Sequence, residues 1–251
     1  MMKFKDIGKG KPVVLLHGFL ENSKMWDEFA EELSKEYRVI SPDLYGHGET
    51  ASIDEKHTME MQAAGVMEVL NHLEISSAAF IGHSMGGYIS LALARDYTDK
   101  VEKLGLFFSS ILPDSEEKKE QRLKAAETAR EDKDNFVRIG VKNLFDQNNL
   151  SNLRDEIEIA RSWAYEMPVD GVTSALKGMR ERTDTTEVLE KADYPIQIIL
   201  GEFDGAIDLE EFKKVIPNRE NIKLNVLPIG HMGHLEAPKE SLEILKSFLK
   251  R

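Results

Sequence analysis

The pattern Gly-His-Ser-Met-Gly at residues 82–86 constrains the fold more than any other feature of this chain. An apolar run at 78–81 precedes it, and a helix-compatible stretch at 88–94 follows it. A serine on a sharp turn between a strand and a helix crowds the residues two positions away on each side, so glycine is required at both places. Such a turn lifts the hydroxyl of Ser84 above the sheet and points the amide of Met85 at the same space. The pattern therefore predicts a nucleophilic serine.

Short apolar runs alternate with helical patterns along most of the chain. The runs lie at residues 13–16, 38–41, 78–81, 104–108, 196–200 and 222–227, with one leading strand expected at 3–7. Helical patterns lie at 26–35, 58–73 and 239–249. Continuous apolar strands separated by helices indicate a parallel sheet that is covered on both faces. We therefore expect an α/β fold with a mostly parallel central sheet of about seven strands.

The stretch 112–194 breaks this rhythm, because about eighty residues pass without a convincing strand. Its patterns are helical, with a helix start at 114–117 and a charge run at 116–134 that is typical of a solvated helix face. We interpret 112–194 as a helical cap inserted into a core formed by 1–111 and 195–251. Apolar cap residues are candidates either for lining a pocket or for ordinary cap core: Phe136, Ile139, Phe145, Trp163 and Met167.

Composition narrows the class of partner. The chain has 251 residues, a formal net charge of −12 and no cysteine, which excludes disulfides, thiolate zinc sites and a cysteine nucleophile. The negative charge disfavours nucleic acid and anionic membrane surfaces, so we expect a small-molecule partner. No apolar run reaches the length of a membrane span, and we expect a cytoplasmic protein. The oligomeric state is left open.

A serine nucleophile needs a base, and the base needs an acid that orients it and stabilises its charge. His231 follows the run 222–227, and Asp204 follows the run 196–200. The carboxyl ends of parallel strands share one edge of the sheet, where ligands bind. We therefore predict that Ser84, Asp204 and His231 meet at this edge as a catalytic triad.

The sequence also offers other candidate acids and bases. His234 is an alternative base, although a packed or solvent-facing loop position suits it better. Asp208 is expected to cap a helix at 209–215, and Asp114 to cap the first helix of the insertion. Glu202 is a weaker candidate for the acid. A metal site of His231, His234 and Glu236 is disfavoured because no other ligand cluster accompanies it, so no metal and no cofactor are expected.

A second oxyanion donor is expected from the loop after the first core strand. The backbone N–H of Phe19 occupies that place, and Gly18 allows the turn. His17 is expected to form structural hydrogen bonds, and His83 to support the site from behind the nucleophile. Three further histidines lack partners in the pattern and are expected on the surface or in loops: His47, His57 and His72.

Together these motifs resemble the α/β-hydrolase superfamily over nearly the whole chain. The resemblance rests on the segments 17–19, 43–48, 82–86 with Gly87, 201–204 and 231–238. In this register His231, and not His234, matches the family's base. Two positions depart from the family pattern, with Tyr45 in place of proline and Thr50 in place of serine. A serine nucleophile argues against the dehalogenase and epoxide hydrolase branches, in which aspartate attacks.

The resemblance implies a serine hydrolase that cleaves a small or medium carboxylic ester through an acyl-enzyme. A carbon–carbon bond hydrolase, a thioesterase or a perhydrolase can use the same residues with a different pocket. A protein of another class, a ligand sensor with slow turnover, can also keep the fold. The rate of turnover separates an enzyme from a sensor.

Overall fold

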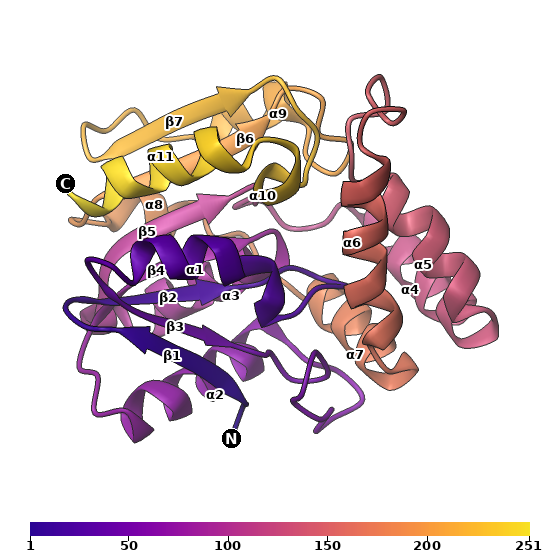
Figure 1. Cartoon of the computed structure of the whole chain (residues 1–251), viewed down its shortest axis with the longest axis horizontal. Coiled ribbons are helices and arrows are strands. Elements are labelled where there is room, and N and C mark those ends of the chain that lie inside the picture. Colours follow the sequence, from indigo (N-terminus) through magenta and orange to yellow (C-terminus); the bar gives the residue numbers. More distant parts are fainter.

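Seven strands form a single sheet in this computed structural model, which describes residues 1–251 (Figure 1). The order across the sheet is β1-β3-β2-β4-β5-β6-β7. The strands are β1 (Phe4–Gly8), β2 (Pro12–Leu16), β3 (Arg38–Pro42), β4 (Ala78–His83), β5 (Val101–Phe107), β6 (Ile196–Gly201) and β7 (Ile222–Leu227). Only β1 pairs antiparallel, with β3, and the other pairs are parallel. The predicted sheet is confirmed.

Helices cover both faces of the sheet because successive side chains of each strand point to opposite sides. In β2, Val13 and Leu15 belong to one apolar cluster, and Val14 and Leu16 belong to the other. The first cluster includes side chains of α1 (Asp27–Leu33) and α11 (Pro238–Leu249). The second includes those of α2 (Met59–His72) and α3 (Met85–Asp96), on the far side of the sheet in Figure 1.

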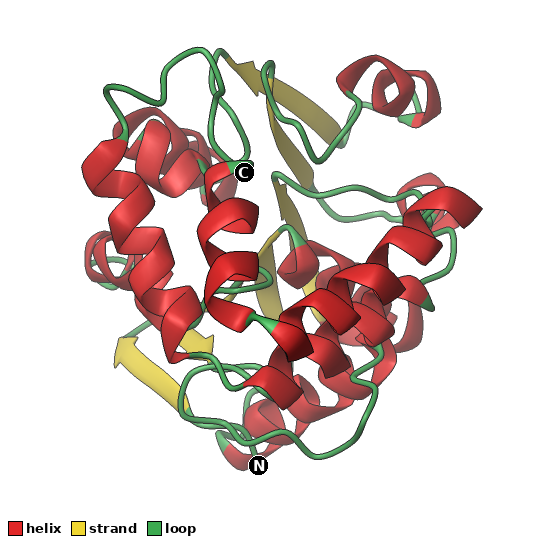
Figure 2. Cartoon of the chain, turned by 90° about the vertical axis from the view of Figure 1, so that its right-hand side faces the viewer, coloured by secondary structure: helices red, strands yellow, loops and turns green.

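Helices also fill the chain between β5 and β6. They are α4 (Glu116–Glu131), α5 (Lys133–Lys142), α6 (Arg154–Glu166), α7 (Val169–Arg180) and α8 (Thr186–Lys191). The helices α4 to α7 lie beyond the carboxyl ends of the parallel strands (Figure 1), and Figure 2 views the molecule from that side. The last helix, α8, packs against α3 of the core instead. Within α4 only Ala126 and Ala129 are buried, as its charged sequence predicts.

The start of α4 corrects one prediction. Ser115, and not Asp114, is the N-cap, because the Ser115 side chain accepts the Lys118 N–H. Asp114 is instead buried and paired with Arg122 and Arg182. Hydrogen bonds between a carboxylate and guanidinium groups are stronger than a hydrogen bond to a backbone N–H, so the arginines hold the Asp114 side chain away from the helix end.

The remaining elements are short. They are η1 (Ser23–Trp26), η2 (Thr98–Lys100), α9 (Leu209–Val215) and α10 (Gly233–Glu236). Asp208 caps α9 as predicted, with its Oδ1 accepting the Glu211 N–H at 3.0 Å. No helix combines the length and apolar character that a membrane crossing needs.

Two loop histidines are more deeply placed than the sequence suggests. His47 and His57 are fully buried, whereas His72 is exposed. His47 Nδ1 lies 3.1 Å from the Tyr45 carbonyl oxygen, and His57 Nε2 lies 3.3 Å from the Ile53 amide nitrogen. These rings bind backbone groups that the loop cannot pair in a sheet, so the surface interpretation of both residues is wrong.

Candidate active site

Ser84 occupies a strained turn between β4 and α3, with φ of 49°. Its N–H donates to the Phe107 carbonyl oxygen at 3.0 Å. A Cβ on Gly82 would lie 2.1 Å from the Gly86 carbonyl oxygen, and one on Gly86 would lie 2.3 Å from that of Leu16. A side chain is therefore excluded two residues before and two residues after the serine, at positions 82 and 86, as the sequence pattern predicts.

His231 and Asp204 meet at the same edge of the sheet. Asp204 follows β6 and His231 follows β7, and His231 Nδ1 lies 2.7 Å from Asp204 Oδ2. The other carboxylate oxygen, Oδ1, accepts the N–H groups of Ala206 at 2.8 Å and Ile207 at 3.3 Å. Burial of the ring acts to lower the pKa of His231, but the charge and hydrogen bond of Asp204, together with the charges of Glu21 and Glu236, outweigh it and raise that pKa above its usual value.

Ser84 and His231 line one cavity of about 430 Å³, together with Phe19. That volume falls within the range of small-molecule sites. No hydrogen bond joins Ser84 Oγ to the His231 ring in this conformation. Hydrogen bonds of a catalytic site are commonly long without substrate and shorten when it binds. The structure thus brings the three predicted residues to one place.

The loop that carries His231 is clamped by a single carboxylate. Glu236 accepts the N–H groups of Asp146, Gly230 and Met232, each at 3.0 Å. Burial raises the pKa of Glu236 in spite of these bonds. The clamp reaches Asp146, between β5 and β6, so it ties the His231 loop to the helical segment. Because these bonds occupy both oxygens, Glu236 is not free to bind a metal with the histidines.

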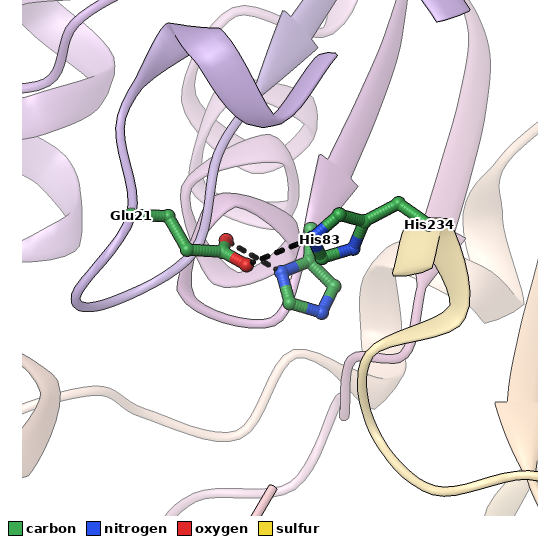
Figure 3. Close-up of side chains that lie close together, drawn as sticks. All are labelled: Glu21, His83 and His234. Atoms are coloured by element: carbon green, nitrogen blue, oxygen red, sulfur yellow. Dashed lines mark hydrogen bonds and ion pairs between the residues drawn. The ribbon is translucent and has the colours of Figure 1, made fainter. Parts of the chain in front are cut away.

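A second buried cluster lies directly behind the site (Figure 3). Glu21 Oε2 accepts the Gly18 N–H at 2.6 Å and lies 2.7 Å from His83 Nδ1. His83 Nε2 lies 3.1 Å from the His231 carbonyl oxygen. Both ring nitrogens of His83 therefore face oxygen acceptors. The His83 ring thus connects the Gly18 turn to the His231 loop.

His234 completes this cluster from α10. Its Nε2 lies 3.4 Å from Glu21 Oε1, and burial lowers the pKa of His234 to about 3. Its ring stacks on Trp163 of α6, with centroids 6.0 Å apart. The three side chains of Glu21, His83 and His234 offer metal-ligand atoms within 4.8 Å of one another. Glu21 Oε2 already has two partners, the Gly18 N–H and His83 Nδ1, whereas Glu21 Oε1 and both ring nitrogens of His234 have no hydrogen-bond partner.

The two residues predicted to supply oxyanion donors lie on segments next to Ser84, Phe19 in the turn after β2 and Met85 at the start of α3. Met85 is the first residue of α3, so its N–H has no acceptor within the helix. Phe19 follows the Gly18 turn and lines the cavity. A Cβ on Gly18 would lie 2.5 Å from Glu21 Oε2, so the turn needs glycine. Both residues thus lie beside Ser84.

The alternative acids are placed elsewhere. Asp208 caps α9, Glu202 is exposed, and Asp114 is paired with two arginines. Of the candidate acids, only Asp204 forms a hydrogen bond with the imidazole of His231.

None of the five apolar cap residues named as pocket candidates lines the cavity. Ile139 is 46% exposed, and Met167 is buried among the helices. Phe136 packs behind Phe19 with ring centroids 6.4 Å apart, while Trp163 packs on His234. That pocket prediction is wrong because apolar spacing marks the buried face of a helix and does not show which helix end faces Ser84. Phe145 is likewise core.

The cavity wall is instead more polar than the sequence suggested. Residues of the helical segment that line it include Asp114, Lys118, Arg122 and Arg182, beside Tyr88 of α3. The sequence placed Lys118 and Arg122 in a solvated charge run. Lys118 and Arg122 lie in the first turns of α4, which follows the carboxyl end of β5. That position is the one sequence signal for a place near the site.

Comparisons with known proteins agree with this architecture. The sequence matches the family described as alpha/beta hydrolase fold over residues 11–238. A thermophilic esterase from Thermogutta terrifontis, with malate bound, has a structure with 34% identity and a TM-score of 0.93, covering 99% of this chain and 93% of that one. An enol-lactonase from Burkholderia xenovorans is 21% identical with a TM-score of 0.91, covering 100% and 96%, and shows the fold alone.

Curated relatives have diverse names. The dihydrolipoyllysine-residue acetyltransferase component of the acetoin cleaving system of Pseudomonas putida is 30% identical over 96% of this chain, which spans 64% of its length. A putative 2-succinyl-6-hydroxy-2,4-cyclohexadiene-1-carboxylate synthase of Bacillus subtilis is 28% identical over 94% of this chain and 89% of its own. This chain belongs to the α/β-hydrolase family, and the prediction of that fold is confirmed.

Proposed function

We propose that this protein is a carboxylesterase-type serine hydrolase that acts on small or medium esters. The observation that carries the proposal is the buried hydrogen bond of 2.7 Å between Asp204 and His231, at the cavity that holds the strained Ser84. A strained backbone conformation costs free energy and is found mostly at functional sites. The close packing around Gly82 and Gly86 holds Ser84 in this conformation. The likeness to the Thermogutta terrifontis esterase, at 34% identity, supports the same function.

In the proposed reaction, His231 Nε2 takes the proton of Ser84 Oγ as the oxygen attacks the ester carbonyl carbon. Asp204 keeps the Nδ1 proton in place and stabilises the imidazolium. The imidazolium then gives its proton to the leaving alcohol oxygen as the carbon–oxygen bond breaks, which leaves an acyl-Ser84 ester. Water, deprotonated by His231, attacks this ester and releases the acid.

The N–H groups of Phe19 and Met85 are proposed as the oxyanion hole. Each donor of this kind contributes roughly 3 kcal/mol to stabilisation of the transition state. The Glu21 carboxylate holds the Gly18 N–H at 2.6 Å and thereby fixes the turn that presents Phe19. Oxyanion-hole donors must be rigid because they act without reorganisation.

The helical segment is proposed as a cap over this site, since α4 supplies part of the cavity wall. We propose the same bounds for the cap as the sequence predicts, residues 112–194. The expectations of a cytoplasmic location, and of no nucleic-acid or membrane partner, stay predictions. The oligomeric state stays open.

The test is hydrolysis of a ladder of p-nitrophenyl esters from acetate to long acyl chains, with Ser84→Ala as the control. Turnover that Ser84→Ala abolishes supports the esterase, and the preferred chain length reports the depth of the pocket. Absent or very slow turnover of every ester contradicts it. That result favours a carbon–carbon bond hydrolase or a ligand sensor.

A further inference from the structure

The inner wall of the cavity carries an excess of positive charge. Three cationic side chains line it, from Lys118, Arg122 and Arg182, against one buried carboxylate, that of Asp114. The side chains of the two arginines are 13% and 10% exposed, and that of Asp114 is 2% exposed. Cations removed from water are costly unless anions pair with them, so this imbalance calls for a further anion.

Asp114 is already saturated by the two arginines. Arg122 Nε and Nη2 both donate to it, and Arg182 Nη1 lies 2.9 Å from its Oδ1. Arg182 is fixed further by two hydrogen bonds to the Leu112 carbonyl oxygen and by stacking on Tyr88, with 4.0 Å from the guanidinium carbon to the ring centroid. The guanidinium groups are therefore held in place before any ligand binds, and Asp114 has little capacity left for Lys118.

Lys118 is the cation without a partner. Its ammonium forms no hydrogen bond or ion pair within the protein, although the side chain is half-buried and lines the cavity. Burial lowers the pKa of Lys118, and the charge of Arg122 lowers it further, with Asp114 acting in the opposite direction. Its place in the first turn of α4 adds the positive end of the helix dipole to the local field.

The other acidic residues of the wall do not neutralise this cluster. Asp208 and Glu211 lie on α9 and are exposed. Asp208 caps its helix, and Glu211 is paired with Lys214. Asp204 faces Lys118 across the site but is committed to His231. The other acidic residues of the wall are therefore exposed, whereas its cationic residues are buried or half-buried.

We propose that Lys118, with Arg122 and Arg182 behind it, forms a subsite for a carboxylate group of the substrate. The proposal rests on the esterase function above and narrows its substrate class to esters that carry a free carboxylate, such as monoesters of short dicarboxylic acids. Ser84 attacks the ester carbonyl at one end of the molecule while Lys118 binds the carboxylate at the other. Charge-assisted hydrogen bonds are the strong ones, so the subsite favours an anionic ester over its neutral analogue.

The experiment compares the monomethyl esters of succinic, glutaric and adipic acid with the corresponding dimethyl esters, following methanol release. We expect wild-type kcat/KM to be at least tenfold higher for the monoester at the best chain length. In Lys118→Met this preference falls about tenfold or more, as expected for the loss of a hydrogen bond to a charged group. The matched control is Lys119→Met, because Lys119 pairs with Glu116 outside the cavity, and it keeps the wild-type preference.

Binding to the Ser84→Ala variant, measured by calorimetry, separates the two proposals. Ser84→Ala is expected to bind the monoester at least tenfold tighter than the diester, and Ser84→Ala with Lys118→Met to lose the difference. Equal affinity for both esters, or a preference that Lys118→Met leaves intact, overturns the carboxylate subsite even if the diesters are hydrolysed through Ser84. Tight binding of the monoester without hydrolysis by the wild type supports the subsite and refutes the esterase function.

Discussion

Glu21 offers the sharpest prediction about stability. Its carboxylate is buried and bridges the Gly18 N–H and Nδ1 of the His83 ring. Replacing Glu21 by glutamine keeps the size of the side chain and removes its charge. The Gly18 N–H and the His83 ring then face a neutral acceptor in a place from which water is excluded. Hydrogen bonds to a charged group are stronger than those to a neutral one, so the loss of the charge is destabilising.

The magnitude follows from the shift of one pKa. Burial alone acts to raise the pKa of Glu21, but the charge and hydrogen bond of His83 outweigh it and lower the pKa from 4.5 to about 2. That shift corresponds to about 3 kcal/mol of stabilisation at pH 7. Because the folded-state pKa is depressed, the contribution is complete above pH 4.5 and is lost as the pH falls toward 2.

We therefore expect Glu21→Gln to lower the free energy of unfolding by about 3 kcal/mol at pH 7, and Tm by roughly 6–12 °C. Urea denaturation followed by fluorescence of the buried Trp26 measures it, at several pH values between 7 and 3. Glu31→Gln is the control, since Glu31 is exposed, and its effect stays within about 0.5 kcal/mol. The reasoning is refuted if both variants are equally stable at pH 7, or if the deficit does not shrink at low pH.

Three further outcomes are expected. Gly86→Ala destabilises the fold by several kcal/mol, because its Cβ meets a backbone carbonyl at 2.3 Å; Gly140→Ala, with open space around it, stabilises α5 by about 0.5–1 kcal/mol in the same denaturation assay. The kcat/KM of ester hydrolysis rises with pH through a midpoint above 6.5, because His231 acts as a base only when the pH exceeds its raised pKa. The same raised pKa means that the cationic form of His231 stabilises the fold fully below pH 6.5 and that this stabilisation is lost above the midpoint. Asp204→Asn lowers kcat roughly 10⁴-fold and moves the midpoint down; an unchanged pH profile contradicts the assigned acid.

Local patterns predicted the parts of the site that lie at strand ends. The run at 222–227 coincides with β7, and Thr58 caps α2 at the start of its predicted helix. The elbow glycines were predictable because the strain of a serine turn is local and allows few residues. The order of strands then brought Asp204 and His231 to the edge that holds Ser84, since parallel strands end on one side.

Features that depend on distant contacts were not predictable in this way. Glu21 gave no signal, because its partner His83 is 62 residues away and only the packed sheet brings them together. The cavity-lining role of Lys118 was missed since a charge run has the same sequence signature on a solvated face and on a binding wall. The sequence leaves Trp163 as a candidate for either the pocket or the cap core, and only the folded chain shows that its ring stacks on His234. Burial of a loop histidine such as His47 likewise follows from tertiary packing.

The central claim is that Ser84 is the nucleophile, and covalent labelling tests it most directly. The protein is treated with diethyl p-nitrophenyl phosphate, residual esterase activity is followed, and the modified peptide is identified by mass spectrometry. We predict one diethylphosphoryl group per chain on Ser84, release of one p-nitrophenolate, and loss of activity in proportion to labelling, with no labelling of Ser84→Ala. Loss of activity with Ser84 unmodified, or wild-type hydrolysis by Ser84→Ala, would contradict the account.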